Sequence, residues 1–334
     1  MGPLSRLPFV FVFLIVFYAS CTKSTTGTSN PNGITIYIVG SNGKNPVLWK
    51  NGVMQILSPT GGSASHVHVY NNTMYIGGIS GQSTSGNLNP GGPGGENVYW
   101  INGVQNIISA SLNPGWPSFA LSGNNFYYAN GFNLYENGSV ISLPGKASGY
   151  IASVFATDSD MYVAGSDSVG DAVYWKNQTM HVVAQGYYPN HISGSDPSVF
   201  CLFVSGTDVY LGGMNAGDTA VYWKNGLATP VFGSDASNYL TAINSLFVSG
   251  GDLYCTGSLT VPVNGGSNAP AYWKNGVEHD LPLNGAAYGN ATSILVSGSD
   301  VYVTGQTSEG AVYWKNDKEI ILSSAGSAND IYVQ

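Results

Sequence analysis

Residues 311–317 read Ala311-Val312-Tyr313-Trp314-Lys315-Asn316-Asp317, an apolar strand that ends in Trp-Lys and runs directly into an Asn turn. A version of this aromatic strand and turn occurs seven times along the chain. The copies are Trp49-Lys50-Asn51-Gly52, Trp100-Ile101-Asn102-Gly103, Tyr135-Glu136-Asn137-Gly138, Trp175-Lys176-Asn177-Gln178, Trp223-Lys224-Asn225-Gly226, Trp273-Lys274-Asn275-Gly276 and Trp314-Lys315-Asn316-Asp317. The spacings between successive copies are 51, 35, 40, 48, 50 and 41 residues.

A repeat of this length that is built from short strands is typical of a β-propeller. The last repeat shows four such segments, and we label them strands a to d from the centre of the ring outward. They cover residues 291–296, 301–305, 311–315 and 319–322. Asn-Gly favours the two-residue turn that joins antiparallel strands in a hairpin. Each repeat is therefore predicted to form one blade of four antiparallel strands.

Two further columns align in strand b of every repeat. The first is a tyrosine, at Tyr37, Tyr75, Tyr127, Tyr162, Tyr210, Tyr254 and Tyr302. Three residues later comes Gly40, Gly78, Gly165, Gly213, Gly257 or Gly305, with Asn130 in the third repeat. A glycine at a fixed strand position indicates either a positive φ or a close backbone approach.

The first repeat lacks its inner strand and begins at strand b, in Ile34-Thr35-Ile36-Tyr37. A spare strand-a sequence follows the seventh repeat, at residues 329–333. The sequence thus predicts an all-β domain over residues 34–334, a seven-bladed β-propeller of four-stranded antiparallel blades. The C-terminal strand completes blade 1 and closes the ring, which leaves no long free edge.

The N-terminal residues carry targeting information. Arg6 precedes an apolar run over residues 7–18 that has the length of a signal peptide. Ala19-Ser20-Cys21 resembles the signal of bacterial lipoproteins, although Tyr18 replaces the usual leucine. The resemblance implies a signal peptide over 1–20 and lipidation of Cys21. Residues 21–33 are rich in Ser, Thr, Gly and Asn, which is typical of a flexible tether.

The chain as a whole resembles a divergent bacterial-type β-propeller repeat lipoprotein, at the level of the fold. Such a protein would be lipid-anchored in the bacterial cell envelope, at the outer membrane or cell surface. Ordinary secretion after cleavage near Ser20 is the alternative. Cys201 and Cys255 fall in successive repeats and are expected to be buried free thiols.

Charge limits the partners of the chain. Only 8% of the residues are charged, the net charge is −8, and Arg6 is the only arginine. An acidic chain without a basic stripe argues against nucleic acid, and against membrane contact other than through a lipid anchor. We expect a monomer. The repeated tryptophans are interpreted as packing between blades, and the lysines beside them as stems that lie on aromatic rings.

A ligand site is expected where the loops vary, in the b–c and d–a loops. Exposed aromatic rings there could stack on a sugar or anchor a protein. The candidates are Trp116, Tyr187, Tyr188, His191, Tyr239 and Tyr288. The inner strands predict a second set of small polar side chains that line the central channel, at His66, Ser118, Ser153, Cys201, Ser245, Ser293 and Asp330.

Asp330 and His66 fall in neighbouring blades. They could form a structural hydrogen bond, or else a metal or acid/base pair. The chain lacks the arginine cluster and Asp boxes of sialidases and the supporting motif of copper-dependent galactose oxidases, and it has no outstanding carboxylate pair of the kind glycosidases use.

The sequence therefore predicts no metal and no cofactor. It favours a non-catalytic binding or assembly module for a glycan or protein. The alternative is a carbohydrate-active hydrolase or lyase that uses Asp196, Asp235, His66 or His191 at the channel mouth.

Overall fold

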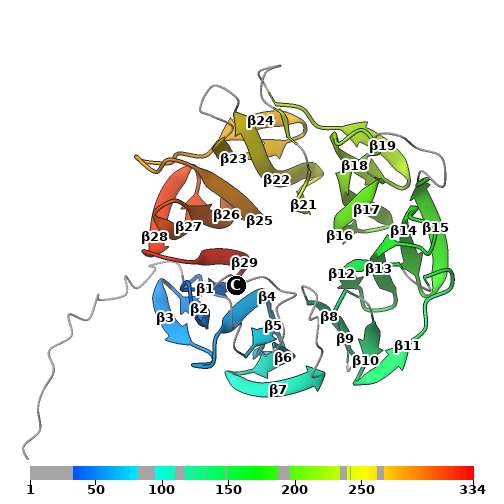
Figure 1. Ribbon diagram of the computed structural model, residues 1–334, viewed down its shortest axis with the longest axis horizontal. Coiled ribbons are helices and arrows are strands. Elements are labelled where there is room, and N and C mark those ends of the chain that lie inside the picture. Colours follow the sequence, from blue (N-terminus) through cyan, green and yellow to red (C-terminus); the bar gives the residue numbers. More distant parts are fainter. Residues whose placement is uncertain are drawn as a thin grey trace, which may run out of the picture.

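The computed structural model describes residues 33–81, 95–109, 117–123, 125–131, 133–146, 149–186, 196–233, 239–240, 242–261 and 267–334. Seven antiparallel sheets form a closed ring around a central channel (Figure 1). The described residues contain strands and turns but no helix, and none could cross a membrane as an apolar helix. The predicted seven-bladed, all-β propeller is confirmed.

The blades follow the order of the repeats. Blade 1 holds β29 (Ser327–Val333), β1 (Ile36–Ser41), β2 (Pro46–Lys50) and β3 (Val53–Ile56). Blade 2 holds β4 (Gly62–Tyr70), β5 (Thr73–Ser80), β6 (Glu96–Ile101) and β7 (Val104–Ser109). Blade 3 holds β8 (Ser118–Ser122), β9 (Asn125–Ala129), β10 (Leu134–Glu136) and β11 (Ser139–Ile141).

The remaining blades continue around the ring. Blade 4 holds β12 (Ile151–Ala156), β13 (Met161–Ser166), β14 (Ala172–Lys176) and β15 (Thr179–Ala184). Blade 5 holds β16 (Ser198–Ser205), β17 (Asp208–Met214), β18 (Ala220–Lys224) and β19 (Leu227–Pro230). Blade 6 holds β20 (Tyr239–Leu240), β21 (Ser245–Ser249), β22 (Asp252–Val261), β23 (Ser267–Lys274) and β24 (Val277–Asp280). Blade 7 holds β25 (Gly289–Ser297), β26 (Asp300–Thr307), β27 (Gly310–Lys315) and β28 (Lys318–Ser323).

The C-terminal strand closes the ring. β29 pairs antiparallel with β1, in a register that sets Val333 opposite Ile36 and Tyr332 opposite Tyr37. Figure 1 shows the two strands side by side, the red end of the chain against the blue beginning. Blade 1 is thus assembled from both ends of the described chain, and the predicted closure is confirmed.

Blade 6 departs from the regular pattern because its inner strand is broken in two. β20 and β21 both pair with β22, whereas Ala242 and Ile243 between them have no partner in its register. In this gap the Ile243 N–H donates to the Gly213 carbonyl of blade 5 at 3.2 Å. The break therefore exchanges part of a sheet ladder for a contact between blades.

The repeated tryptophans are buried between the blades. All six have at most 1% of their surface exposed. In three blades the indole N–H also donates to the incoming d–a connection: Trp175 to the Pro144 carbonyl at 2.8 Å, Trp273 to Phe232 at 3.0 Å and Trp314 to Pro282 at 2.9 Å. Each of these tryptophans therefore fills a core and also fixes where the chain enters its blade.

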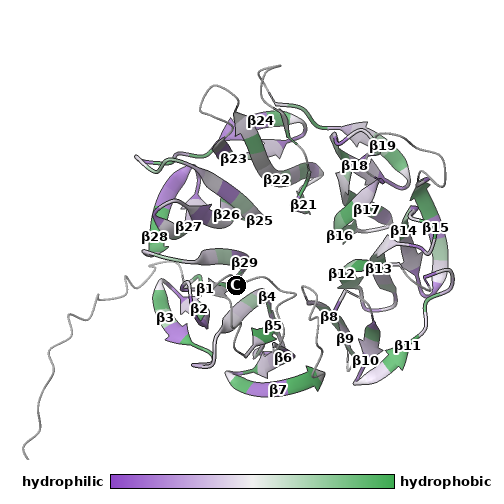
Figure 2. Cartoon of the chain, viewed as in Figure 1, coloured by the Kyte–Doolittle hydropathy of each residue, from purple (hydrophilic) through white to green (hydrophobic). Residues whose placement is uncertain are grey.

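The outer strands form the rim of the ring and contain both hydrophobic and hydrophilic stretches (Figure 2). Val104 on β7 is 68% exposed and Leu227 on β19 is 74% exposed.

The turn asparagine joins two turns of one blade. Each of the seven has a φ between 47° and 51°, which suits the hairpin turn. Its side-chain oxygen also accepts the N–H of the residue that follows the a–b turn, as in Val301 N–H to Asn316 at 2.9 Å. In blades 4 to 7 its amide donates to an a–b turn aspartate, as from Asn316 to Asp300 at 2.8 Å. The a–b and c–d turns therefore share one face, which we call the turn face, and the b–c and d–a loops form the opposite loop face.

A lysine completes this cluster in the same four blades. Its ammonium group lies over the strand-b tyrosine ring and pairs with the turn aspartate, as Lys224 does with Tyr210 at 5.2 Å and Asp208 at 2.8 Å. The lysine ammonium groups thus lie over the tyrosine rings.

The strand-b glycines allow a close approach rather than a positive φ. A Cβ at Gly40, Gly213 or Gly305 would collide with a backbone carbonyl of strand a in the same blade, and one at Gly165 with the carbonyl of Tyr150 just before strand a. Strand a carries a β-bulge at this level in five blades, as between Val199 and Cys201 in blade 5. The bulge shifts strand a by one residue just before the side chains that line the channel.

Candidate functional site

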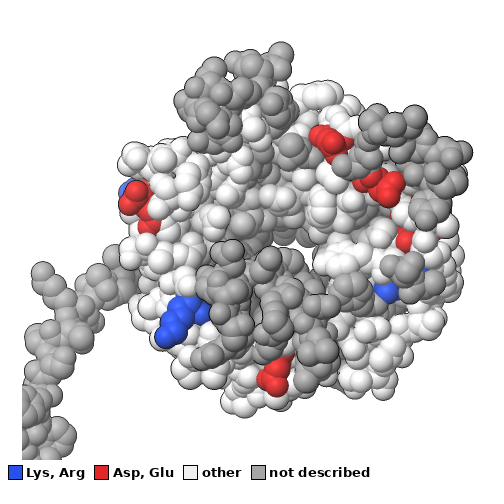
Figure 3. Space-filling model, in the orientation of Figure 1, with Lys and Arg blue, Asp and Glu red and all other residues white. Residues whose placement is uncertain are grey.

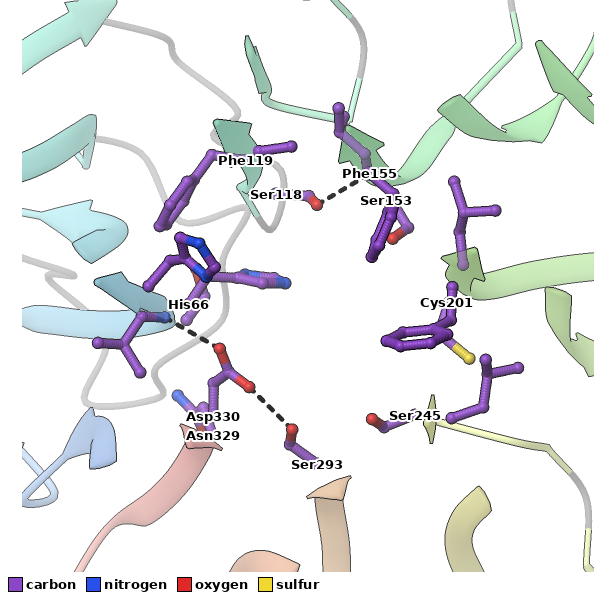
Figure 4. A pocket seen from close by; sticks show the side chains of 18 of the residues that line it. His66, Ser118, Phe119, Ser153, Phe155, Cys201, Ser245, Ser293, Asn329 and Asp330 are labelled. Atoms are coloured by element: carbon purple, nitrogen blue, oxygen red, sulfur yellow. Dashed lines mark hydrogen bonds between the residues drawn. The ribbon is translucent and has the colours of Figure 1, made fainter. Parts of the chain in front are cut away.

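The inner strands surround a cavity of about 670 Å³ on the axis of the ring. Every one of the seven residues that the sequence assigns to the channel lines this cavity, and Figure 4 shows them projecting inward from different blades. They occupy equivalent positions, since each pairs with the strand-b residue just before the glycine column or, in blade 3, before Asn130. The pairs include His66 with Gly77, Ser118 with Ala129 and Asp330 with Val39.

Several of these side chains tie one blade to the next. They accept the backbone N–H of the following inner strand: Asp330 from Val67 at 2.9 Å, Ser118 from Val154 at 3.0 Å and Ser245 from Ile294 at 3.3 Å. Ser293 donates its hydroxyl proton to the other carboxylate oxygen of Asp330 at 2.8 Å. The small polar residues of the channel therefore satisfy backbone groups that the curvature of the ring leaves open.

Asp330 and His66 are close in the fold but have different partners. Asp330 binds Val67 and Ser293, whereas the His66 ring contacts Phe119 edge-on at 6.2 Å between centroids. His66 Nδ1 is buried without a hydrogen-bond partner. No group of three His, Cys, Asp or Glu side chains that could hold a metal occurs in the described part of the chain.

A second tier of the channel is lined by aromatic and imidazole rings, and it was not predicted from the sequence. Phe155, Phe203 and Phe247 come from β12, β16 and β21 and line the cavity beside one another, with centroids 5.3 and 4.9 Å apart. His68 and Tyr332 contact edge-on at 4.9 Å on the side of blades 1 and 2. Each residue of this tier comes two positions after a predicted channel residue. The two-residue period of a β-strand could therefore have identified this tier from the sequence.

Burial lowers the pKa of His68, and the nearby Asp330 carboxylate opposes this effect only in part. Burial also raises the pKa of Cys201 and Cys255 far above that of an ordinary thiol. Both cysteines are unpaired, and a thiol held in its protonated form is a poor nucleophile. In the channel, burial thus favours the neutral forms of His68 and of the Cys201 thiol.

Few of the predicted loop-face residues can be placed. Tyr288 precedes β25 and is 47% exposed. Tyr239 lies in β20 opposite Thr260, but its side chain is not described. Trp116, Tyr187, Tyr188 and His191 lie outside the described residues, as does Cys21.

The loop face carries further exposed aromatic side chains that were not predicted from the sequence. Tyr150 is 37% exposed, Phe200 41% and Phe232 64%. All three lie in d–a connections or at the start of an inner strand, and Tyr150 and Phe200 also line the cavity. Figure 3 shows this face, where the few charged side chains lie toward the periphery of the ring. Two of the exposed rings, Tyr150 and Phe200, therefore belong both to the loop face and to the wall of the cavity.

Two carboxylates of the loop face support loop structure. Asp167 accepts the Val169 and Asp171 N–H groups, both at 2.9 Å, and Asp171 accepts the Gly186 N–H at 2.7 Å. Asp196, a candidate of the hydrolase alternative, precedes β16 in blade 5, whereas His66 lies on β4 in blade 2. The two are not brought together. Asp235 and His191 lie outside the described residues.

Comparison with known proteins supports the fold alone. No protein-family model and no curated protein sequence matches the chain. It is similar to the extracellular domain of a putative hybrid two-component system of B. thetaiotaomicron, with 14% identity and a TM-score of 0.52 over 88% of this chain and 36% of that one. A prolyl endopeptidase structure matches with 10% identity and a TM-score of 0.50, over 90% of this chain and 50% of that one. The chain therefore spans between a third and half the length of these proteins.

Proposed function

We propose that this protein is an envelope-anchored, non-catalytic binding module that holds a glycan or a protein on its loop face. The observation that carries the proposal is the exposure of Tyr150, Phe200, Phe232 and Tyr288 on one face that has few charges. Aromatic rings of this size are usually at least partly buried, and exposed apolar groups on one surface are typical of binding sites. Stacking on such rings suits sugar faces as well as protein side chains.

The hydrogen bonds of three described carboxylates favour binding over hydrolysis. Asp167 and Asp171 are committed to backbone N–H groups, and Asp330 to an inter-blade bond. A glycosidase needs two carboxylates that flank one bond, within about 10 Å of each other. Binding through neutral hydrogen bonds and aromatic stacking needs no such pair.

Anchoring follows from the N-terminal sequence. A lipidated Cys21 followed by a tether would hold the propeller at a membrane surface, and two or more acyl chains anchor stably where one does not. The described chain begins at Gly33, next to β1, whose first residues lie at the turn face. The tether would therefore attach to the turn face and leave the loop face available to ligands.

The test combines ligand discovery with paired substitutions. A glycan array and a pull-down from envelope extracts identify the ligand, and isothermal titration then measures its affinity for Phe232→Ala and Tyr288→Ala. We expect at least a tenfold loss of affinity in one of them, with an unchanged melting temperature. Leu227→Ala on the rim is the matched control, since it removes an exposed apolar side chain from β19 instead.

Two results would contradict the proposal. The first is unchanged affinity in both loop-face variants combined with lost affinity in a turn-face variant such as Asn225→Ala. The second is release of shortened products from a bound polysaccharide, which would identify a hydrolase or lyase.

A further inference from the structure

The central channel holds one carboxylate without a counter-charge. Among the described residues that line the cavity, Asp330 is the sole carboxylate, and neither lysine nor arginine is present. Burial lowers the pKa of His68, which favours the neutral form of this neighbour over one that would compensate the charge. An uncompensated carboxylate in a partly buried site is costly.

The negative charge exceeds what the fold requires at this position. Asp330 accepts the N–H of the next inner strand, but serine makes the same bond at Ser118 and at Ser245. A neutral hydroxyl would therefore satisfy this part of the ring. The aspartate adds a negative charge that the hydrogen bond from the Val67 N–H does not require.

The carboxylate also retains free acceptor capacity. One oxygen accepts from the Val67 N–H and the other from the Ser293 hydroxyl, whereas a carboxylate offers about four acceptor positions. Figure 4 shows the Asp330 carboxylate projecting into the channel between His66 and Ser293. A donor inside the channel could therefore reach it.

The opposite wall suits an apolar body. Phe155 and Phe203 come from blades 4 and 5, across the ring from β29 in blade 1 (Figure 1), and Phe247 continues the wall in blade 6. Aromatic rings bind apolar groups by stacking and attract cations to their faces. The cavity volume of about 670 Å³ lies within the range of small-molecule sites.

We propose that the channel binds a small organic cation, an ammonium compound with an aromatic or aliphatic body. The ammonium group pairs with Asp330, and the body packs against Phe155, Phe203 and Phe247. The four residues that carry this proposal are not among the exposed loop-face aromatics, although Tyr150 and Phe200 line the same cavity. The proposal does not depend on a glycan or protein ligand at the loop face.

The probe is tryptamine, with tryptophol as its uncharged counterpart, measured by isothermal titration with the whole propeller. We expect tryptamine to bind at least tenfold more tightly than tryptophol. Asp330→Asn should weaken tryptamine at least tenfold, because the amide lacks the charge. The amide oxygen still accepts from the Val67 N–H, and the amide NH2 group donates to the Ser293 hydroxyl in place of the original bond. Phe203→Leu should weaken tryptamine and tryptophol alike.

Asp280→Asn is the control, since Asp280 lies exposed on the outer strand β24 and should leave binding unchanged. If Asp330→Asn is unstable, Asp330→Ser replaces it, because serine occupies this position in other blades. Equal affinity for tryptamine and tryptophol would overturn the proposal, as would unchanged binding in the Asp330 variant. It is also overturned if neither tryptamine nor hexylamine binds at about 10 mM.

Discussion

At the scale of single residues, the hairpin turns show how one side chain can serve two purposes. The turn asparagine adopts a left-handed backbone and also bonds to the start of strand b. The residue after it is left-handed as well, and it is glycine in five of the seven copies. Gln178 and Asp317 are the exceptions, with φ values of 68° and 62°.

Gln178→Gly should stabilise the protein. A non-glycine residue in the left-handed region costs about 1 kcal/mol, which is partly offset by the greater freedom of glycine in the unfolded chain. We expect the melting temperature to rise by about 1–2 °C. Gly226→Gln, the reverse substitution in the equivalent turn of blade 5, is the control and should lower the melting temperature. A fall in melting temperature for Gln178→Gly would show that the glutamine side chain makes a contribution of its own.

The turn-face ion pairs should make stability depend on acid pH. The Lys224 ammonium and the Asn225 amide bond to Asp208 and hold its pKa below the ordinary value of 3.8. A group whose pKa is depressed by folding contributes stability above its unfolded pKa and loses it as the pH falls through the folded value.

Asp208→Asn should therefore melt below the wild type at pH 7, and the difference should shrink as the pH falls below about 4. Because the pair is solvent-exposed, 1 M NaCl should also shrink it. Thermal melts between pH 7 and pH 2.5 check both effects. A difference that stays constant over this range would mean that the charge of Asp208 contributes nothing.

At the scale of strands, the sequence was informative where a motif is local and uninformative where a bulge intervenes. The strand-b Tyr and Gly columns lie within a few residues of each other, so they align without knowledge of the ring. Phe200 illustrates the opposite case. Strict alternation from Cys201 would place it in the inter-blade core beside Leu202, but the bulge after Val199 leaves it 41% exposed at the channel mouth.

The channel was predictable for a related reason. Its polar residues follow the bulge and keep a constant distance from the end of strand a, so counting backward from that end finds them. The loop-face aromatics lie before the bulge or in connections of unequal length. No fixed spacing leads to Tyr150 or Phe232, and their exposure is a property of the folded ring.

β29 should be indispensable. It supplies the inner strand of blade 1 and also Asp330, which bonds to blade 2. Deletion of residues 328–334 removes these bonds and exposes backbone groups of β1. We expect an insoluble protein or a melting temperature lowered by more than 10 °C. Deletion of Gln334 alone is the control and should cost much less. A protein lacking residues 328–334 that melts within about 2 °C of the wild type would be inconsistent with closure by this strand.

At the scale of the whole molecule, the closure of the ring determines which face a membrane anchor would approach. Strand b runs from the turn face to the loop face, and the described chain enters β1 at the turn face, where Asn51 binds the Ile36 N–H at 2.8 Å. A chain of twelve Gly/Ser-like residues spans about 20 Å on average. The proposed lipid on Cys21 would therefore keep the turn face nearer the membrane than the loop face.

Energy transfer on vesicles can test this orientation. The lipidated protein carries Cys201→Ser and Cys255→Ala, and one donor dye on a new cysteine at Ser299 in the a–b turn of blade 7 or at Tyr288 on the loop face. Transfer to a headgroup acceptor should be stronger from position 299, because the proposed tether would attach to that face. Cys21→Ala should abolish transfer from both positions by releasing the protein. Equal transfer from the two positions would mean that the propeller takes no preferred orientation, and stronger transfer from position 288 would mean that the loop face meets the membrane and not a ligand in solution.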